Sequence, residues 1–199
     1  DLATNDTTPT LTGTAEANAT VTLVVDGQTY IINADAAGTW SVDVTTALTD
    51  GDYTVSVTAT DASGNTSDAG TGALAIDTTA PDAPTVTDLA TNDTTPTLTG
   101  TAEANATITL VVDGQTYITN ADATGTWSVD VTTGLTDGDY TVSVTATDAS
   151  GNTSSAGTGA LAIDTTAPDA PTVTDLATND TTPTLTGTAE ANATVTLVV

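Results

Sequence analysis

Carboxylates are the only side chains in this sequence that carry charge at neutral pH. The 199 residues include 26 Asp and Glu side chains and no Lys, Arg, His or Cys, which gives a formal net charge of −26. Carboxylate oxygens are preferred ligands of hard divalent cations such as Ca²⁺, and a chain without counter-charge repels itself unless cations neutralise it. The composition therefore points first to calcium binding.

The same composition excludes several classes of function. Binding nucleic acid needs Lys or Arg to displace phosphate counterions, and an anionic membrane surface repels a polyanion. Disulfides, Cys or His metal sites and Lys-dependent isopeptide bonds are absent because their residues are absent. Acid–base catalysis would depend on carboxylates in exposed turns, so we do not expect an enzyme.

Glu is rare, and its position is constant. The chain holds three Glu residues, Glu16, Glu103 and Glu190, each at the same place in a repeated segment. A longer carboxylate that binds a cation through both oxygens would account for the choice of Glu, so we predict these three as calcium ligands. The alternative is a solvated turn residue that was copied when the segment duplicated.

Several Asp residues and one Asn complete the predicted ligand set. They begin a proline-rich linker or belong to an Asp-Ala-Ser-Gly-Asn turn: Asp61, Asp77, Asp148, Asn152 and Asp164. A second tier lies at Asp-Gly turns, which need no metal to explain them: Asp50, Asp52, Asp137 and Asp139. No Asp-x-Asp-x-Asp-Gly loop with Glu at its twelfth position occurs, which excludes an EF-hand.

These residues recur because the sequence repeats every 87 residues. The string DLATNDTTPTLTGTAEANAT begins at positions 1, 88 and 175. The first two copies differ at five positions: Val21/Ile108, Ile32/Thr119, Ala37/Thr124, Ala47/Gly134 and Asp68/Ser155. This period is too long for a solenoid unit and suits one small domain per repeat.

Each repeat has the pattern of an all-β domain. Apolar residues alternate with Thr and Ser, which is typical of half-buried strands, and no helical period occurs. The predicted strands of the second repeat cover 85–87, 97–102, 107–112, 115–120, 127–132, 140–147 and 159–163. Asp-Gly turns separate them, and Leu135–Tyr140 resembles a tyrosine corner. We therefore predict tandem seven-strand immunoglobulin-like β-sandwiches that form an end-to-end rod.

Two proline-rich linkers, 77–84 and 164–171, set the expected domain boundaries. Two prolines in eight residues make a short, stiff connector. We expect a repeat that lacks its first strand at 1–76, a complete repeat at 77–163, and the first three strands of a third repeat at 164–199. The partial repeats fit either a window on a longer array or strands that a neighbouring copy supplies.

The expected strand order places acidic turns at both ends of each domain. One end of the second repeat should gather Asp77, Glu103, Asp122 and Asp148, with Asn152 nearby. The opposite end should gather Asp88, Asp93, Asp113, Asp137 and Asp139. The acidic ends of consecutive domains then face each other and repel. We expect the domains to separate at the junction without Ca²⁺, and we expect Ca²⁺ to stiffen the junction.

Three stretches of the chain resemble the bacterial Ig-like repeats of giant secreted adhesins and biofilm-associated proteins. They are the Asp-Thr-Thr-Ala-Pro linker, the Thr-Pro-Thr-Leu-Thr-Gly-Thr-Ala-Glu run at 95–103, and Thr-Asp-Ala-Ser-Gly-Asn at 147–152. The resemblance covers the whole chain. It implies a secreted or cell-surface extender, with calcium at the domain junctions and a terminal adhesion domain outside this segment.

Three functions follow as hypotheses. The first is a structural stalk of a bacterial surface adhesin or fibre, stiffened by Ca²⁺, whose partners are neighbouring identical repeats. The second is a self-assembling extracellular filament or biofilm-matrix subunit whose strands are completed by neighbouring copies. The third makes the repeat itself a ligand-binding module. That hypothesis needs an exposed aromatic side chain or a pocket, whereas Trp40 and Trp127 fall on the apolar side of a predicted strand.

Overall fold

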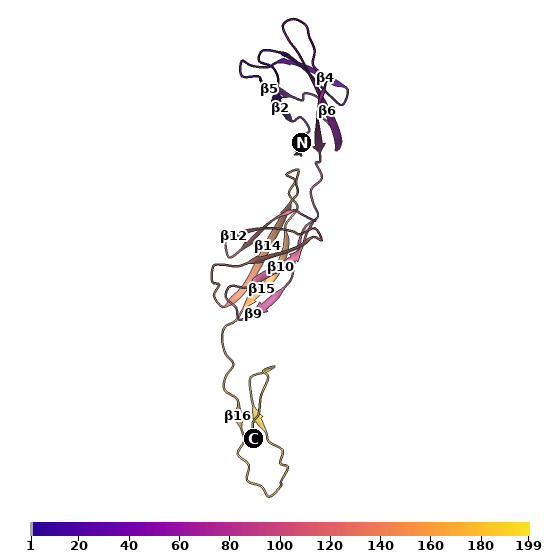
Figure 1. Cartoon of the computed structure of the whole chain (residues 1–199). Helices are drawn as coiled ribbons and strands as arrows, with labels where there is room; N and C mark the ends of the chain where they lie inside the picture. Colours follow the sequence, from indigo (N-terminus) through magenta and orange to yellow (C-terminus); the bar gives the residue numbers. More distant parts are fainter. Residues whose placement is uncertain (1) are drawn as a thin grey trace.

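The computed structural model describes residues 2–199, which form strands, turns and loops. Figure 1 shows two β-domains and an open C-terminal segment that follow one another along one long axis. The predicted all-β fold of tandem Ig-like domains is confirmed. No helix occurs in the described range, and hence none that is long and apolar enough to cross a membrane.

The second repeat is a sandwich of two sheets. The smaller sheet has the order β13 (Thr126–Asp130), β10 (Thr97–Thr101) and β8 (Thr85–Val86). The larger sheet has the order β12 (Gln115–Asn120), β11 (Thr107–Val112), β14 (Gly138–Thr147), β15 (Gly157–Ile163) and β9 (Leu89–Thr91). Neighbouring strands are antiparallel, except that β9 runs parallel to β15.

Strand β9 was not predicted from the sequence. The chain leaves the smaller sheet after β8 and joins the edge of the larger sheet at Leu89, so the first strand of the sandwich is split between the two sheets. Three residues are too few for a period-2 signal. The seven predicted strands are present, and β9 is the eighth.

The alternation in the sequence places every second strand residue in the core. The largest fully buried side chains of the second repeat are Trp127, Leu98, Ile108, Leu110 and Leu161. Burying each of these contributes about 1.5–3 kcal/mol or more. The Tyr140 hydroxyl donates a hydrogen bond to the carbonyl oxygen of Thr136 at 2.8 Å, which confirms the predicted tyrosine corner.

The first repeat has the same larger sheet but a smaller second sheet. The larger sheet has the order β1 (Leu2–Thr4), β7 (Gly70–Ile76), β6 (Gly51–Thr60), β3 (Thr20–Val25) and β4 (Gln28–Asn33). The other sheet pairs only β2 (Thr10–Thr14) with β5 (Thr39–Asp43). Among residues 2–199, no strand occupies the place in the first repeat that β8 occupies in the second.

Residues 164–199 form little regular structure. Strands β16 (Thr172–Val173) and β17 (Gly187–Thr188) pair over two residues. Nearly all side chains of this segment are exposed, including Val173 at 58%. The segment holds the start of a sandwich without a second sheet to cover it.

Candidate site at the junction between repeats

A turn of the second repeat holds the linker that joins it to the first. This turn, Asp148–Asn152, connects β14 to β15. The side-chain amide of Asn152 donates a hydrogen bond to the carbonyl oxygen of Asp77 at 2.7 Å. The backbone N–H of Asn5 donates to the carbonyl oxygen of Ser150 at 2.9 Å. The two domains are therefore in direct contact across the linker.

Asp148 gives the turn its shape. One carboxylate oxygen accepts hydrogen bonds from the backbone N–H groups of Ser150 and Asn152, both at 2.9 Å, and the other accepts from the Asn152 amide at 2.8 Å. Burial raises the pKa of Asp148, but these hydrogen bonds outweigh it and the pKa lies below its usual value. Asn152 is 8% exposed, and its amide nitrogen joins two predicted ligands, Asp77 and Asp148.

The same turn occurs in the first repeat, at the end that lies away from the linker. Asp61 accepts hydrogen bonds from the backbone N–H groups of Ser63 and Asn65 at 2.8 Å, and from the Asn65 side-chain amide at 2.7 Å. The Asn65 amide is the main cause of the lowered pKa of Asp61. Asn65 is exposed, whereas its counterpart at 152 is buried.

The three Glu residues are exposed: Glu16 lies between β2 and β3, Glu103 lies between β10 and β11, and Glu190 follows β17. Glu103 and the linker residue Asp82 line the same shallow cleft. Glu16 lines a cleft of the first repeat together with Asp61. Glu190 is exposed in the open third segment.

Two residues of the second tier fasten the linkers to their own domains. Asp50 accepts hydrogen bonds from the N–H of Thr78 at 3.1 Å and from its hydroxyl at 2.8 Å. Asp137 makes the same two bonds with Thr165, at 3.0 and 2.7 Å. The Thr165 hydroxyl is the main cause of the lowered pKa of Asp137. These carboxylates therefore serve as anchors for each linker.

The remaining predicted ligands are exposed. Asp52 and Asp139 lie near the start of β6 and β14, and Asp139 shares a shallow cleft with Asp88. The carboxylate of Asp164 accepts a hydrogen bond from the N–H of Thr166 at 2.9 Å. Asp139 and Asp164 lie at the other end of the second repeat, whereas Asp52 pairs with Ala75 at the end of the first repeat that faces the linker.

The donor chemistry of this junction fits a hard cation, although its carboxylates are dispersed. Within residues 2–199, no group of three or more acidic side chains lies close enough to hold a metal ion. The oxygens available at the junction are the carboxylates of Asp77 and Asp148 and the carbonyl oxygens of Asp77 and Ser150. Hydrogen-bond donors from Asn152 and Asn5 satisfy several of these oxygens. A bound cation would recruit oxygens that now accept N–H groups.

A comparison with known families identifies the domains. A sequence model of the bacterial Ig-like domain matches residues 1–78 and, a second time, residues 82–165. The chain belongs to the bacterial Ig-like domain family. The resemblance predicted from the linker and turn motifs is thereby confirmed for both of these Ig-like domains.

Solved structures with related sequence come from adhesins. One is a 1.5-MDa bacterial ice-binding adhesin, with 30% identity over 80% of this chain and 59% of that chain and a TM-score of 0.35. Another is a Ca²⁺-stabilized adhesin that helps an Antarctic bacterium reach out and bind ice, with 32% identity over 85% and 47% of the two chains and a TM-score of 0.38. This chain thus spans about half the length of these structures. A search of curated proteins found no match.

A single Ig-like domain gives a third similarity. It comes from the M. primoryensis ice-binding adhesin and shares 29% identity over 43% of this chain and 97% of that chain, with a TM-score of 0.31. Its length corresponds to one repeat of this chain.

Proposed function

We propose that this chain is a stalk segment of a bacterial cell-surface adhesin or fibre, secreted to the cell surface, with a mechanical and not a catalytic role. Its partners are neighbouring repeats of the same kind, and the adhesion domain lies outside this segment. Direct contact with nucleic acid or membrane is not part of this role. The proposal is supported by the tandem Ig-like domains and by the adhesins that share their sequence.

The docked turn of the second repeat is the observation that carries this proposal. Domains joined by flexible linkers would not need hydrogen bonds between one domain and the next. Here Asn152 and Ser150 bind the end of the first repeat, while Asp50 holds the linker residue Thr78 from the other side. Together with the prolines of the linker, these bonds restrict bending at the junction. A restricted junction is what a spacer needs in order to extend.

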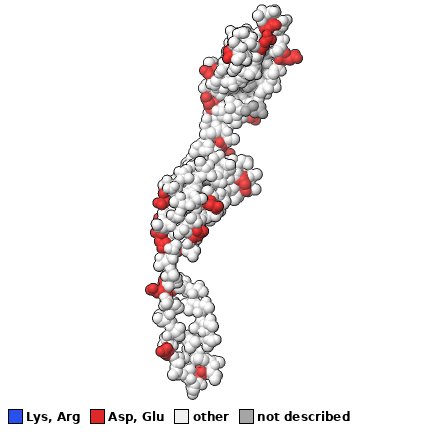
Figure 2. All heavy atoms as spheres, turned by 60° about the vertical axis from the view of Figure 1, so that its left-hand side comes forward, with Lys and Arg blue, Asp and Glu red and all other residues white. Residues whose placement is uncertain are grey.

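We further propose that Ca²⁺ stiffens the junction through Asp77 and Asp148, with Glu103 and Asp82 close to the linker. Figure 2 shows acidic side chains distributed along the visible face of the molecule and no basic residue to offset them. Extracellular calcium modules have Kd values on the order of 10⁻⁴–10⁻³ M, and a tenfold to hundredfold excess over Kd stabilises by about 1.4–2.7 kcal/mol. The calcium-stabilised relative supports this assignment.

A calcium titration of the full chain tests the proposal, with melting temperature and small-angle scattering measured on the same samples. We expect calcium to raise the melting temperature and to narrow the distribution of lengths toward that of a rod. Sodium chloride at equal ionic strength controls for screening. The response should be weakened in Asp148→Asn and retained in Asp61→Asn, because only Asp148 lies at the internal junction. Equal flexibility in calcium and in chelator would refute the calcium assignment.

A further inference from the structure

Strands β4 and β12 form an open edge of the larger sheet in the first and second repeats. Each stands at the end of its sheet order, and within residues 2–199 no strand pairs with its outer side. Both strands have six residues, whereas β1 and β9 at the opposite edge have three. The smaller sheets end in strands of five residues or fewer. β4 and β12 are therefore the longest sheet edges of the two domains.

This edge is open wherever a repeat stands in the row. Ile31, in the repeat that is followed by another domain, is 69% exposed, and Ile118, in the repeat that is preceded by one, is 68% exposed. The domains follow one another end to end along the long axis, and β12 lies at the side of its domain in Figure 1. Further repeats of the same sequence would therefore leave this edge uncovered.

The backbone of β12 offers unused hydrogen-bonding groups along this edge. The N–H of Ala121 donates to the carbonyl oxygen of Ala106 at 2.9 Å, in the same register as the ladder between β11 and β12. Residues of an antiparallel strand bond alternately to one side and to the other. The N–H and C=O groups of every second residue therefore point away from β11: Thr116, Ile118 and Asn120. A strand laid beside β12 would bind these groups.

The inner side of each edge strand is fixed by the core. Tyr117 packs against the core of the second repeat, and the equivalent Tyr30 packs against the core of the first. The next residue, Ile118, points to solvent, as does its diagonal neighbour Val111 on β11, which is 39% exposed. A strand that is already ordered, with apolar side chains on its outside, binds a partner at a low cost in conformational entropy.

The edge carries no charge, although the chain is strongly anionic. β12 reads Gln-Thr-Tyr-Ile-Thr-Asn, and β4 differs from it only by Ile32 in place of Thr119. Neither strand has the Lys or Pro that commonly protects an edge from pairing. The nearest carboxylates, Asp113 and Asp122, lie in the segments that flank β12. Two copies can therefore approach through this edge without bringing carboxylates of the strands together.

We propose that β4 and β12 are the surfaces through which one stalk binds another, and that the partner is the same edge of a second copy in antiparallel orientation. Antiparallel pairing of identical strands is symmetric: Ile118 faces Ile118, and Thr116 faces Asn120. The outward groups of both copies are then satisfied together. A basic partner would be drawn to the acidic turns instead, because the strand itself holds no carboxylate.

Antiparallel pairing gives this contact a function that rests on the proposed stalk. The strands of the second repeat run roughly along the long axis (Figure 1). Two stalks joined through them therefore point in opposite directions, as stalks do when they extend from two facing cells. The contact would hold such cells together along the stalks, in addition to any adhesion by the terminal domain.

Each contact is weak by itself, and salt should strengthen it. A pairing of two six-residue strands is small compared with the about 1,200–2,000 Å² that stable complexes bury, so affinity grows with the number of repeats that pair. The register also brings Asp113 of one copy near Asp122 of the other, where like charges repel. Screening this repulsion with salt favours the pairing.

Sedimentation of the full chain tests the contact, with chelator present so that calcium plays no part. We expect the average mass to rise with concentration from the 19.5 kDa of one chain toward that of a dimer or more. The rise should be larger at about 1 M than at about 0.15 M sodium chloride. I31D/I118D should abolish it, because the new carboxylates would face each other across the contact. T54D/T141D adds the same charge at exposed positions two strands away and should assemble like the unmodified chain.

Disulfide trapping tests the register, since the chain has no cysteine. Residues that face each other as a hydrogen-bonded pair have Cα atoms about 5.5 Å apart, which a disulfide can span. I31C/I118C should therefore form linked dimers and longer species several times faster than T54C/T141C under mild oxidation. In a mixture, T29C/T116C and N33C/N120C should link to each other faster than either links to itself.

Four results would each overturn the inference. The chain could stay monomeric at both salt concentrations, or I31D/I118D could assemble as T54D/T141D does. I31C/I118C could link no faster than T54C/T141C, or T29C/T116C could link fastest to itself, which would mean parallel strands. Calcium is absent from all these measurements, so their failure leaves the calcium titration of the stalk unaffected, and the converse also holds.

Discussion

Two turns of identical sequence have different surroundings in this molecule. Asp61–Asn65 lies at the end of the first repeat away from the linker, and Asp148–Asn152 lies against the end of a preceding repeat. Both fold in the same way, with one carboxylate accepting the same three hydrogen bonds. Only the second turn bonds to another domain. The turn is thus formed by its local sequence, and its role as a junction comes from the neighbour.

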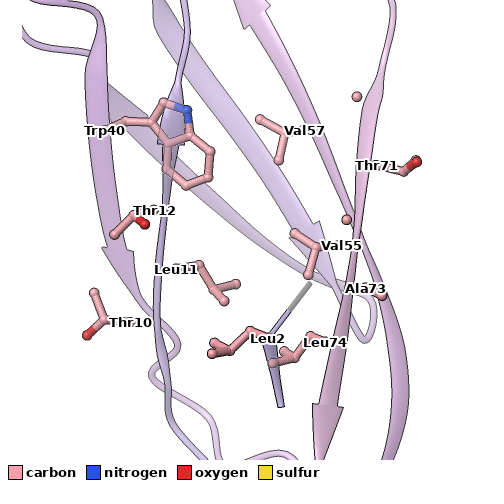
Figure 3. Close-up of a pocket in the computed structure, with 12 residues that line it drawn as sticks. Leu2, Thr10, Leu11, Thr12, Trp40, Val55, Val57, Thr71, Ala73 and Leu74 are labelled. Carbon is pink, nitrogen blue, oxygen red and sulfur yellow. The ribbon is translucent and has the colours of Figure 1, made fainter. Parts of the chain in front are cut away.

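The largest expected difference between the repeats lies in their cores. Leu98→Ala should lower the free energy of unfolding of the second repeat by about 2–5 kcal/mol, because this side chain is 1% exposed. Leu11→Ala should lower the free energy of unfolding of the first repeat by less, because Leu11 is 8% exposed and lines an open cleft between β2 and β7 (Figure 3). Denaturation followed by tryptophan fluorescence measures each repeat separately once the other Trp is replaced by Phe. Equal losses would show that the cleft closes in solution.

The next difference concerns the two asparagines. Asn152→Ala should destabilise by about 1–3 kcal/mol, because it leaves a carboxylate and the carbonyl oxygen of Asp77 without their donor. Asn65→Ala removes one exposed bond and should have a smaller effect. Thermal melting measures both, and residual dipolar couplings report the angle between the domains. The range of angles between the two domains should widen only in Asn152→Ala. An unchanged range would argue against the docked turn.

The pKa values of the two carboxylates sharpen the comparison. The pKa of Asp148 and of Asp61 lies below the unfolded value of about 3.9, so this stabilisation is present above that pH and is lost as the pH falls through the folded pKa. Removing the Asn amide should raise both values. The pKa of Asp148 should rise further, because burial opposes its charge. Carboxyl carbon chemical shifts measured against pH give both values, and equal shifts would contradict a buried junction.

The smallest expected effect is at the linker anchors. Asp137→Asn should speed amide hydrogen exchange at Thr165, which donates its N–H to that carboxylate. Asp50→Asn should speed exchange at Thr78 less, because the neighbouring Asp77 is also held by the docked turn. Exchange measured by NMR resolves the two sites. A larger effect at Thr78 would mean that the turn does not restrain the linker.

The sequence was sufficient to predict what depends on local periodicity. The seven strands, the Asp-Gly turns and the corner at Tyr140 follow from alternation and turn chemistry. Strand β9 was missed because it has three residues and is held by pairing with β15. The contact between Asn5 and Ser150 uses backbone groups of two domains, so no side-chain type could have indicated it. The calcium role of Glu103 remains a prediction.

The parallel pairing of β9 with β15 determines how a complete repeat would respond to pulling. Tension along the array draws β9 toward the N-terminus and β15 toward the C-terminus. The two strands lie side by side and run in the same direction, so this force slides one past the other. The bonds between Leu89–Thr91 and Leu161–Ile163 are then loaded together in shear instead of being opened one at a time. A short strand that adds little to the core would thus set the rate at which the domain unfolds under force.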